Sequence, residues 1–117
     1  MPRPTEIRLQ QNSRQLVLGF DNDTSCTLSC EYLRVYSPSA EVRGHGPGQE
    51  TLQVGKEQVN ITAVEPVGNY GVKLVFDDGH DSGIYGWDYL YELGQKKEAN
   101  WADYLQRLAD AGHQRAE

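Results

Sequence analysis

One histidine in this sequence has neighbours that suit chemistry. His80 follows an Asp-Asp-Gly turn and stands between Asp78 and Asp81. An imidazole beside carboxylates can bind a divalent ion or exchange protons near neutral pH. A turn histidine with acidic neighbours is also typical of a solvated surface, and the sequence leaves both interpretations open. We predict His80 and Asp78 as the candidate metal ligands.

A second candidate site is the loop that contains His45. Three glycines and a proline fall within residues 44–49, so this segment does not favour a regular element. Flanking glycines let backbone N–H groups approach a ligand closely, while the alternative is an exposed loop without a ligand. We predict that His45 contacts a ligand and that Arg43 beside it offers a charged fork.

Aromatic side chains follow the His80 turn closely. Tyr85, Trp87, Tyr89 and Tyr91 alternate along the chain next to two glycines. Such rings can form a cage or an interface hot spot, and core packing explains them equally well. Tyr85 and Trp87 are the residues that we predict to form the wall of a ligand or partner site.

The two cysteines, Cys26 and Cys30, are spaced C-x3-C. A disulfide between them would be unusual in a reducing cytosol, and a complete zinc site requires about four Cys or His ligands. We therefore expect two partly buried thiols. The GxSxG, P-loop lysine and HExxH motifs are absent, and we expect no independent enzyme.

Periodicity and turn chemistry predict the elements that would position these residues. Alternation predicts strands, Ser29 is a suitable N-cap, and Gly94 and Asn100 are expected to end one helix and begin the next. The expected strands are a hairpin over 5–20, a third strand over 24–28, and further strands over 52–55, 59–67 and 72–76. The expected helices cover residues 30–36, 87–93 and 101–111.

These elements predict an α+β fold with a twisted antiparallel sheet of five to seven strands and two or three helices, the last two at the C-terminus. The 117 residues are enough for one domain, 1–117. The net charge of −6 and the absence of a basic cluster argue against nucleic acid and anionic membranes as partners. No apolar run matches a membrane helix or a secretory signal, so we expect a cytoplasmic location.

Two segments carry a resemblance to a known family. They contain the motifs L-R-V-x-S-P-S-A-E-V-x-G-H-G, within residues 32–49, and D-D-G-H-x-S-G-I-Y, within residues 59–90. With the opening hairpin they resemble the gamma-butyrobetaine-hydroxylase-like N-terminal domain family, long catalogued as a domain of unknown function. The similarity extends over residues 5–93.

The resemblance implies a zinc site that this chain does not reproduce. In the hydroxylases this domain precedes an iron- and 2-oxoglutarate-dependent oxygenase domain and binds a structural zinc through three closely spaced cysteines and a histidine. His80 matches that histidine. Residues 36–39 are Tyr, Ser, Pro and Ser, while Cys26 and Cys30 lie before the L-R motif. We therefore expect the zinc site to be lost.

Two function hypotheses follow. The first is a non-catalytic binding or interaction module with a small ligand or a protein partner between the G-H-G-P-G loop and the D-G-H turn. The second follows from the resemblance, because related domains occur fused to P-loop ATPases that carry iron–sulfur clusters. It is a metal-handling or iron–sulfur assembly accessory protein. Neither hypothesis fixes a cofactor, and zinc or iron is the candidate metal in both.

Overall fold

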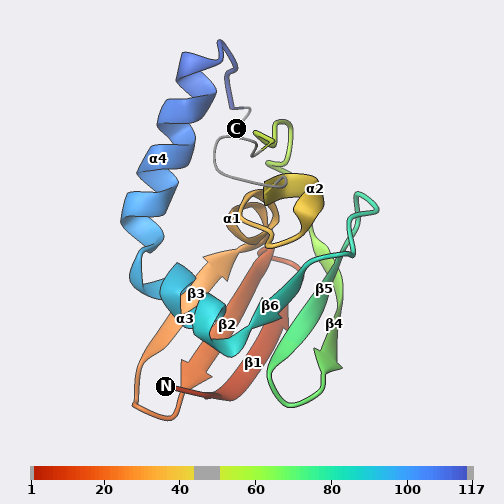
Figure 1. The fold of residues 1–117 in the computed structure, drawn as a ribbon, viewed down its shortest axis with the longest axis vertical. Coiled ribbons are helices and arrows are strands. Elements are labelled where there is room, and N and C mark those ends of the chain that lie inside the picture. The colour runs from red at the N-terminus through yellow and green to blue at the C-terminus, as the bar shows by residue number, and fades with distance from the viewer. Residues whose placement is uncertain (1, 44–50, 116–117) are drawn as a thin grey trace.

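The computed structural model describes residues 2–43 and 51–115 and has an α+β architecture (Figure 1). Six strands form two three-stranded antiparallel sheets, with orders β1-β2-β3 and β4-β5-β6. The strands are β1 Pro4–Gln10, β2 Gln15–Phe20, β3 Ser25–Ser29, β4 Ile61–Val67, β5 Gly71–Phe76 and β6 Ile84–Gly86. The helices are α1 Cys30–Val35, α2 Ala40–Arg43, α3 Trp87–Gln95 and α4 Lys97–Asp110. The α+β class and the number of strands are confirmed, but the strands divide between two sheets.

The first sheet confirms the predicted hairpin and third strand. Leu9 pairs with Leu16 across the hairpin, and Leu16, Leu18 and Phe20 are buried as their alternation predicted. In the second sheet Val72, Leu74 and Phe76 form the inward row, which was also predicted. The strand expected over 52–55 is not formed, and β4 begins at Ile61 instead of at residue 59.

Helix α1 lies at the centre of the fold, and all six of its residues are buried. Ser29 is its N-cap, as predicted, because its hydroxyl accepts a hydrogen bond from the Tyr32 N–H at 3.0 Å. One hydrophobic cluster joins side chains of both sheets, α1 and α3. Helix α1 therefore connects the two sheets through a shared core.

The two C-terminal helices are longer than the sequence indicated. Helix α3 continues through Gly94 to Gln95, and α4 begins at Lys97, so that Asn100 is an interior residue of α4. Its amide donates to the Tyr32 hydroxyl at 3.0 Å. A tertiary contact thus replaces the predicted cap. Within the described residues, no helix is long and apolar enough to cross a membrane.

Tyrosine hydroxyls connect α1 and its neighbours to distant backbone. Five hydroxyls each donate a hydrogen bond to a main-chain carbonyl at least 51 residues away in sequence. The pairs are Tyr32 with Leu93, Tyr36 with Asn100, Tyr85 with Leu33, Tyr89 with Tyr36, and Tyr104 with Gln53. Burial raises the pKa of Tyr32 and of Tyr104 to about 12. The hydroxyls therefore remain protonated donors at neutral pH.

Gly94 permits the close approach of α3 to β3, and this contact can be tested. A Cβ at Gly94 would lie 2.8 Å from the Cys26 sulfur. Alanine is intrinsically better than glycine in a helix by about 1 kcal/mol, but crowding in a packed contact costs about 1–3 kcal/mol. We predict that Gly94→Ala lowers the free energy of unfolding in the wild-type chain and raises it in a Cys26→Ala background. Urea unfolding of the four chains measures this, and equal effects in both backgrounds would contradict it.

Candidate functional site

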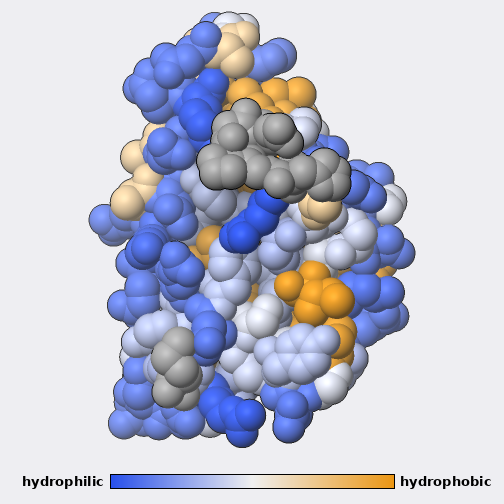
Figure 2. Space-filling model, viewed as in Figure 1, coloured by the Kyte–Doolittle hydropathy of each residue, from blue (hydrophilic) through white to orange (hydrophobic). Residues whose placement is uncertain are grey.

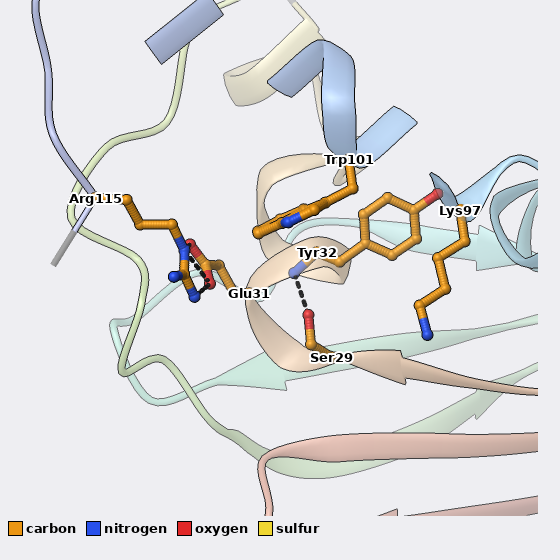
Figure 3. Close-up of a pocket in the computed structure, with 6 residues that line it drawn as sticks. All are labelled: Ser29, Glu31, Tyr32, Lys97, Trp101 and Arg115. Atoms are coloured by element: carbon orange, nitrogen blue, oxygen red, sulfur yellow. Dashed lines mark hydrogen bonds and ion pairs between the residues drawn. The ribbon is translucent and has the colours of Figure 1, made fainter. Parts of the chain in front are cut away.

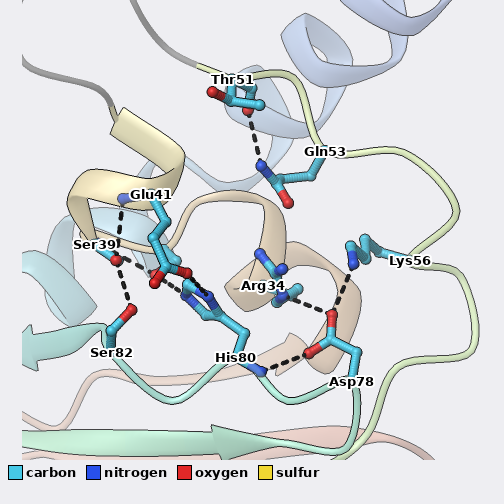
Figure 4. Close-up of polar contacts among 10 residues, drawn as sticks. Arg34, Ser39, Glu41, Thr51, Gln53, Lys56, Asp78, His80 and Ser82 are labelled. Atoms are coloured by element: carbon cyan, nitrogen blue, oxygen red, sulfur yellow. Dashed lines mark hydrogen bonds and ion pairs between the residues drawn. The ribbon is translucent and has the colours of Figure 1, made fainter.

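The turn between β5 and β6 lies against the segment that joins α1 to α2. The Phe76 N–H donates to the His80 carbonyl at 3.0 Å, and the His80 N–H donates to the Asp78 carboxylate at 3.1 Å. Figure 4 shows the His80 ring pointing toward Glu41, with Asp78 on the other side of the turn. The turn thus presents the two side chains to different neighbours.

The His80 ring is held by a hydrogen bond at each nitrogen. His80 is only 5% exposed; its Nε2 lies 2.8 Å from the Ser37 hydroxyl and its Nδ1 lies 3.2 Å from the Glu41 carboxylate. The carboxylate can only accept, so Nδ1 donates to Glu41 and Nε2 of the neutral ring accepts from Ser37. Burial lowers the pKa of His80, as does the positive charge of Arg34. The imidazole is therefore neutral at pH 7.

The order Ser37, His80, Glu41 has the connectivity of a nucleophile, a base and an acid. Ser37 is, however, fully buried, and its oxygen already accepts the Ser39 N–H at 3.2 Å. The chain at Gly83 is so close that a Cβ there would lie 2.4 Å from that oxygen. The Ser37 hydroxyl therefore has no room beside it for a substrate, and it serves to orient the histidine.

Asp78 is bound by two cations. It accepts from Arg34 Nε at 2.9 Å and from Lys56 Nζ at 2.8 Å. Burial raises the pKa of Asp78, but the hydrogen bonds that Lys56, the His80 N–H and Arg34 donate to it outweigh this effect. Together they lower the pKa of Asp78 to about 2. Arg34 has a side chain that is 9% exposed, and its Nη1 has no hydrogen-bond partner in the described residues. Asp78 is thus the counter-ion of a buried guanidinium.

The His80 and Asp78 side chains do not fit the structural zinc that the family resemblance implies. A structural zinc requires about four Cys, His or carboxylate ligands that converge on one point. Among residues 2–43 and 51–115 no group of three or more His, Cys, Asp or Glu side chains is placed to hold a metal. The lone pair of His80 Nε2 is engaged by Ser37, and Asp78 is neutralised by Arg34 and Lys56. Binding at this corner would require breaking these contacts.

The four predicted ligand or partner residues are found in different settings. His45 lies outside the described residues. Arg43 ends α2 with its guanidinium 4.8 Å from the ring centre of Tyr89. Tyr85 is fully buried, so it supports the corner from inside and cannot itself form the wall of an open site. Trp87 is half-buried and lines a surface groove.

The two thiols lie in different contacts. The Cys26 sulfur faces Gly94 of α3, while the Cys30 sulfur lies 3.7 Å from the Asn60 side-chain oxygen. Both are free cysteines, and burial raises the pKa of each thiol. Neither thiol has the lowered pKa that metal binding or redox chemistry favours.

Sequence reasoning missed four residues that build the corner: Arg34, Ser37, Glu41 and Lys56. Arg34 stands between Leu33 and Val35 in the predicted helix, but neither neighbour indicates that the helix is buried on all sides. A buried charge requires an opposite charge nearby. Which carboxylate would provide it depends on the tertiary fold.

Comparison with known proteins identifies the family. The model for the gamma-butyrobetaine hydroxylase-like, N-terminal family matches residues 7–91. The chain belongs to this family. The predicted resemblance to this family is thereby confirmed over residues 7–91. A search of curated proteins returned no match.

Solved structures agree with this membership of the gamma-butyrobetaine hydroxylase-like N-terminal family. Two proteins with solution NMR structures are 53% and 54% identical to this chain, with TM-scores of 0.85 and 0.84. Both matches cover 98% of this chain, and they cover 90% and 86% of the other chains. A crystal structure from Acidithiobacillus ferrooxidans, a DUF971 protein described as of unknown function, is 37% identical with a TM-score of 0.67. That match covers 79% of this chain and 92% of the other.

The neutral state of His80 predicts how stability depends on pH. The folded-state pKa is lowered from the usual value of about 6.5, so the unfolded chain takes up a proton more readily. The stabilisation is complete above about pH 6.5 and is lost as the pH falls through the folded-state pKa. We predict that the free energy of unfolding, measured in urea from pH 7.5 to 5, falls less steeply in His80→Gln than in the wild-type chain.

The ¹⁵N resonances of the His80 ring provide the control. At pH 7 they should show protonated Nδ1 and unprotonated Nε2, and one equivalent of zinc should leave them unchanged. An imidazolium at pH 7, a shift with zinc, or an identical pH dependence in His80→Gln would contradict the assignment.

Proposed function

We propose that this chain is a non-catalytic protein-binding domain that docks a partner through one exposed face. We name this the β6 face and define it by Tyr70, Ile84, Gly86 and Trp87. The observation that carries the proposal is the exposure of large apolar side chains there: Tyr70 is 56% and Ile84 is 44% exposed. Figure 2 shows an apolar patch on this side of the molecule, over the region of β5 and β6. Apolar side chains that gather on one face favour a partner site.

A groove continues the β6 face. It has a volume of about 420 Å³ and is lined by Tyr70, Gly86, Trp87 and the charged residues Arg3 and Asp88, together with Pro2 and Asn69. The apolar floor with charges of both signs at the edge resembles the core and rim of protein interfaces. The occupant that fits is an extended segment of a partner protein that inserts an apolar side chain.

The β6 face is preorganised by contacts beneath it. Trp87 donates its indole N–H to the Asn69 carbonyl at 2.8 Å and its backbone N–H to the Tyr70 carbonyl at 3.0 Å. Tyr85, between Ile84 and Gly86, points inward and donates to the Leu33 carbonyl. A rigid face loses little conformational entropy on binding, which favours affinity.

The His80 corner supports this function indirectly. The His80 ring is paired with Ser37 and Glu41, and the turn that contains it lies shortly before β6 in the chain. The corner therefore positions the β6 face. The alternative metal-handling function has no comparable support, since the thiols and the His80 donors are engaged elsewhere.

The prediction concerns one exposed side chain of the β6 face. Ile84→Asp places a charge where an apolar contact is expected, and we predict that it weakens partner binding at least about tenfold, since a desolvated charge costs more than 1.4 kcal/mol. The partner is isolated by cross-linking in cells, purified, and titrated by calorimetry. Because Ile84 is exposed, the unfolding temperature should change little.

Leu105→Asp is the matched control, because Leu105 is 40% exposed on α4 and carries the same substitution to another surface. It should bind like the wild-type chain. Equal binding of the Ile84→Asp and wild-type chains, or equal weakening by both substitutions, would overturn the proposal.

A further inference from the structure

A second site lies at the other end of α1, around Glu31. Glu31 is only 5% exposed although it is a carboxylate in the first turn of a short helix. A buried carboxylate requires a cation that also forms hydrogen bonds. Arg115 provides it from the C-terminal tail, with its Nε 2.9 Å and 3.1 Å from the two oxygens and its Nη2 in contact with one of them.

The guanidinium is also held by an aromatic face. Arg115 Cζ lies 5.5 Å from the ring centre of Trp101, and the hydrogen bonds that Arg115 donates to Glu31 raise the pKa of Arg115. A planar cation between a carboxylate and an indole uses both modes by which proteins recognise guanidinium. We call the site formed by Glu31 and Trp101 the Glu31–Trp101 cradle. Its two contacts favour arginine over lysine.

The cradle opens into a pocket that Arg115 lines and leaves partly empty. The pocket has a volume of about 260 Å³ and is lined by Ser29, Glu31, Tyr32, Lys97, Trp101 and Arg115 (Figure 3). This volume is below the range of about 300–1,000 Å³ that is typical for cofactor sites, and it suits part of a side chain. Figure 3 shows Glu31 and Lys97 on opposite sides of Tyr32 and Trp101.

Arg115 is more exposed to solvent than Glu31, the residue that it contacts. The Arg115 side chain is 34% exposed, whereas the carboxylate beneath it is 5% exposed and has no other hydrogen-bond partner in the described part of the chain. If Arg115 moves away, the Glu31 carboxylate loses its hydrogen-bonded counter-ion. Another guanidinium would restore the same charge pairing and hydrogen bonds.

We propose that the Glu31–Trp101 cradle is a binding site for an arginine side chain of a partner protein, and that Arg115 occupies it as an internal competitor. The tail then regulates the site, because a partner must outcompete a tethered group at high effective concentration. This site is separate from the β6 face and does not depend on the function proposed for that face.

The test uses the full chain with Arg115→Ala and the probe N-acetylargininamide. The Trp101 indole N–H resonance, distinguished from that of Trp87 by a Trp87→Phe chain, reports binding. We expect the probe to bind Arg115→Ala at least about tenfold more tightly than the wild-type chain, since the competitor is gone. The probe should also raise the unfolding temperature of Arg115→Ala and leave that of the wild-type chain unchanged.

Two controls decide the outcome. N-acetyllysinamide should bind Arg115→Ala at least about tenfold more weakly than the arginine probe, and this comparison involves no further substitution. Glu31→Gln combined with Arg115→Ala should lose the arginine response if it folds. A folded Arg115→Ala chain without a Trp101 shift, equal binding of both probes, or an unchanged response in the double variant would overturn the proposal.

Discussion

The complete burial of α1 is the constraint on which the rest of this structure depends. Six residues connect two sheets through one core, and two of them, Glu31 and Arg34, are charged. Neither charge can remain in the interior without a counter-ion. Arg34 is balanced by Asp78 in the turn before β6, and Glu31 by Arg115 in the C-terminal tail. One short helix therefore forms ion pairs with two distant segments.

The two ends of α1 differ in what they leave for function. At Arg34 the guanidinium is balanced by Asp78, which also accepts hydrogen bonds from Lys56 and from the His80 N–H. These contacts hold the chain in place before it enters β6. At Glu31 the counter-ion comes from an exposed side chain beside a pocket, so the contact can be exchanged. The charge of Arg34 therefore stabilises the fold, whereas the charge of Glu31 is available to bind a partner.

Much of the fold could be predicted because its signals are local. Alternation identified β2 and β5, Ser29 identified the start of α1, and the motif at the His80 turn identified the family. The start of α4 could not be predicted. Asn100 is a residue type typical of an N-cap, but its side-chain amide donates a hydrogen bond to the Tyr32 hydroxyl instead. A tertiary hydrogen bond overrides local preference there.

The candidate site was predicted only in part, for a related reason. His80 and Asp78 were found from their neighbours in sequence, but Ser37 and Arg34, which determine their state, lie more than 40 residues away. Tyr85 and Trp87 are two residues apart and have similar side chains, yet one is fully buried and the other lines the groove. Their burial differs because Tyr85 faces inward from β6 while Trp87 is the first residue of α3. The spacing of the aromatic residues alone does not predict this difference.

A double-mutant cycle between Arg34 and Asp78 tests the central role of charge burial most directly. The free energy of unfolding in urea at pH 7 is measured for the wild-type chain, Arg34→Met, Asp78→Asn and the combined variant. If Asp78 serves chiefly to balance Arg34, the substitution Asp78→Asn is much less destabilising once Arg34 is apolar, with a coupling of at least about 1 kcal/mol. Additivity within about 0.5 kcal/mol would contradict the account, because the two charges would then be independent.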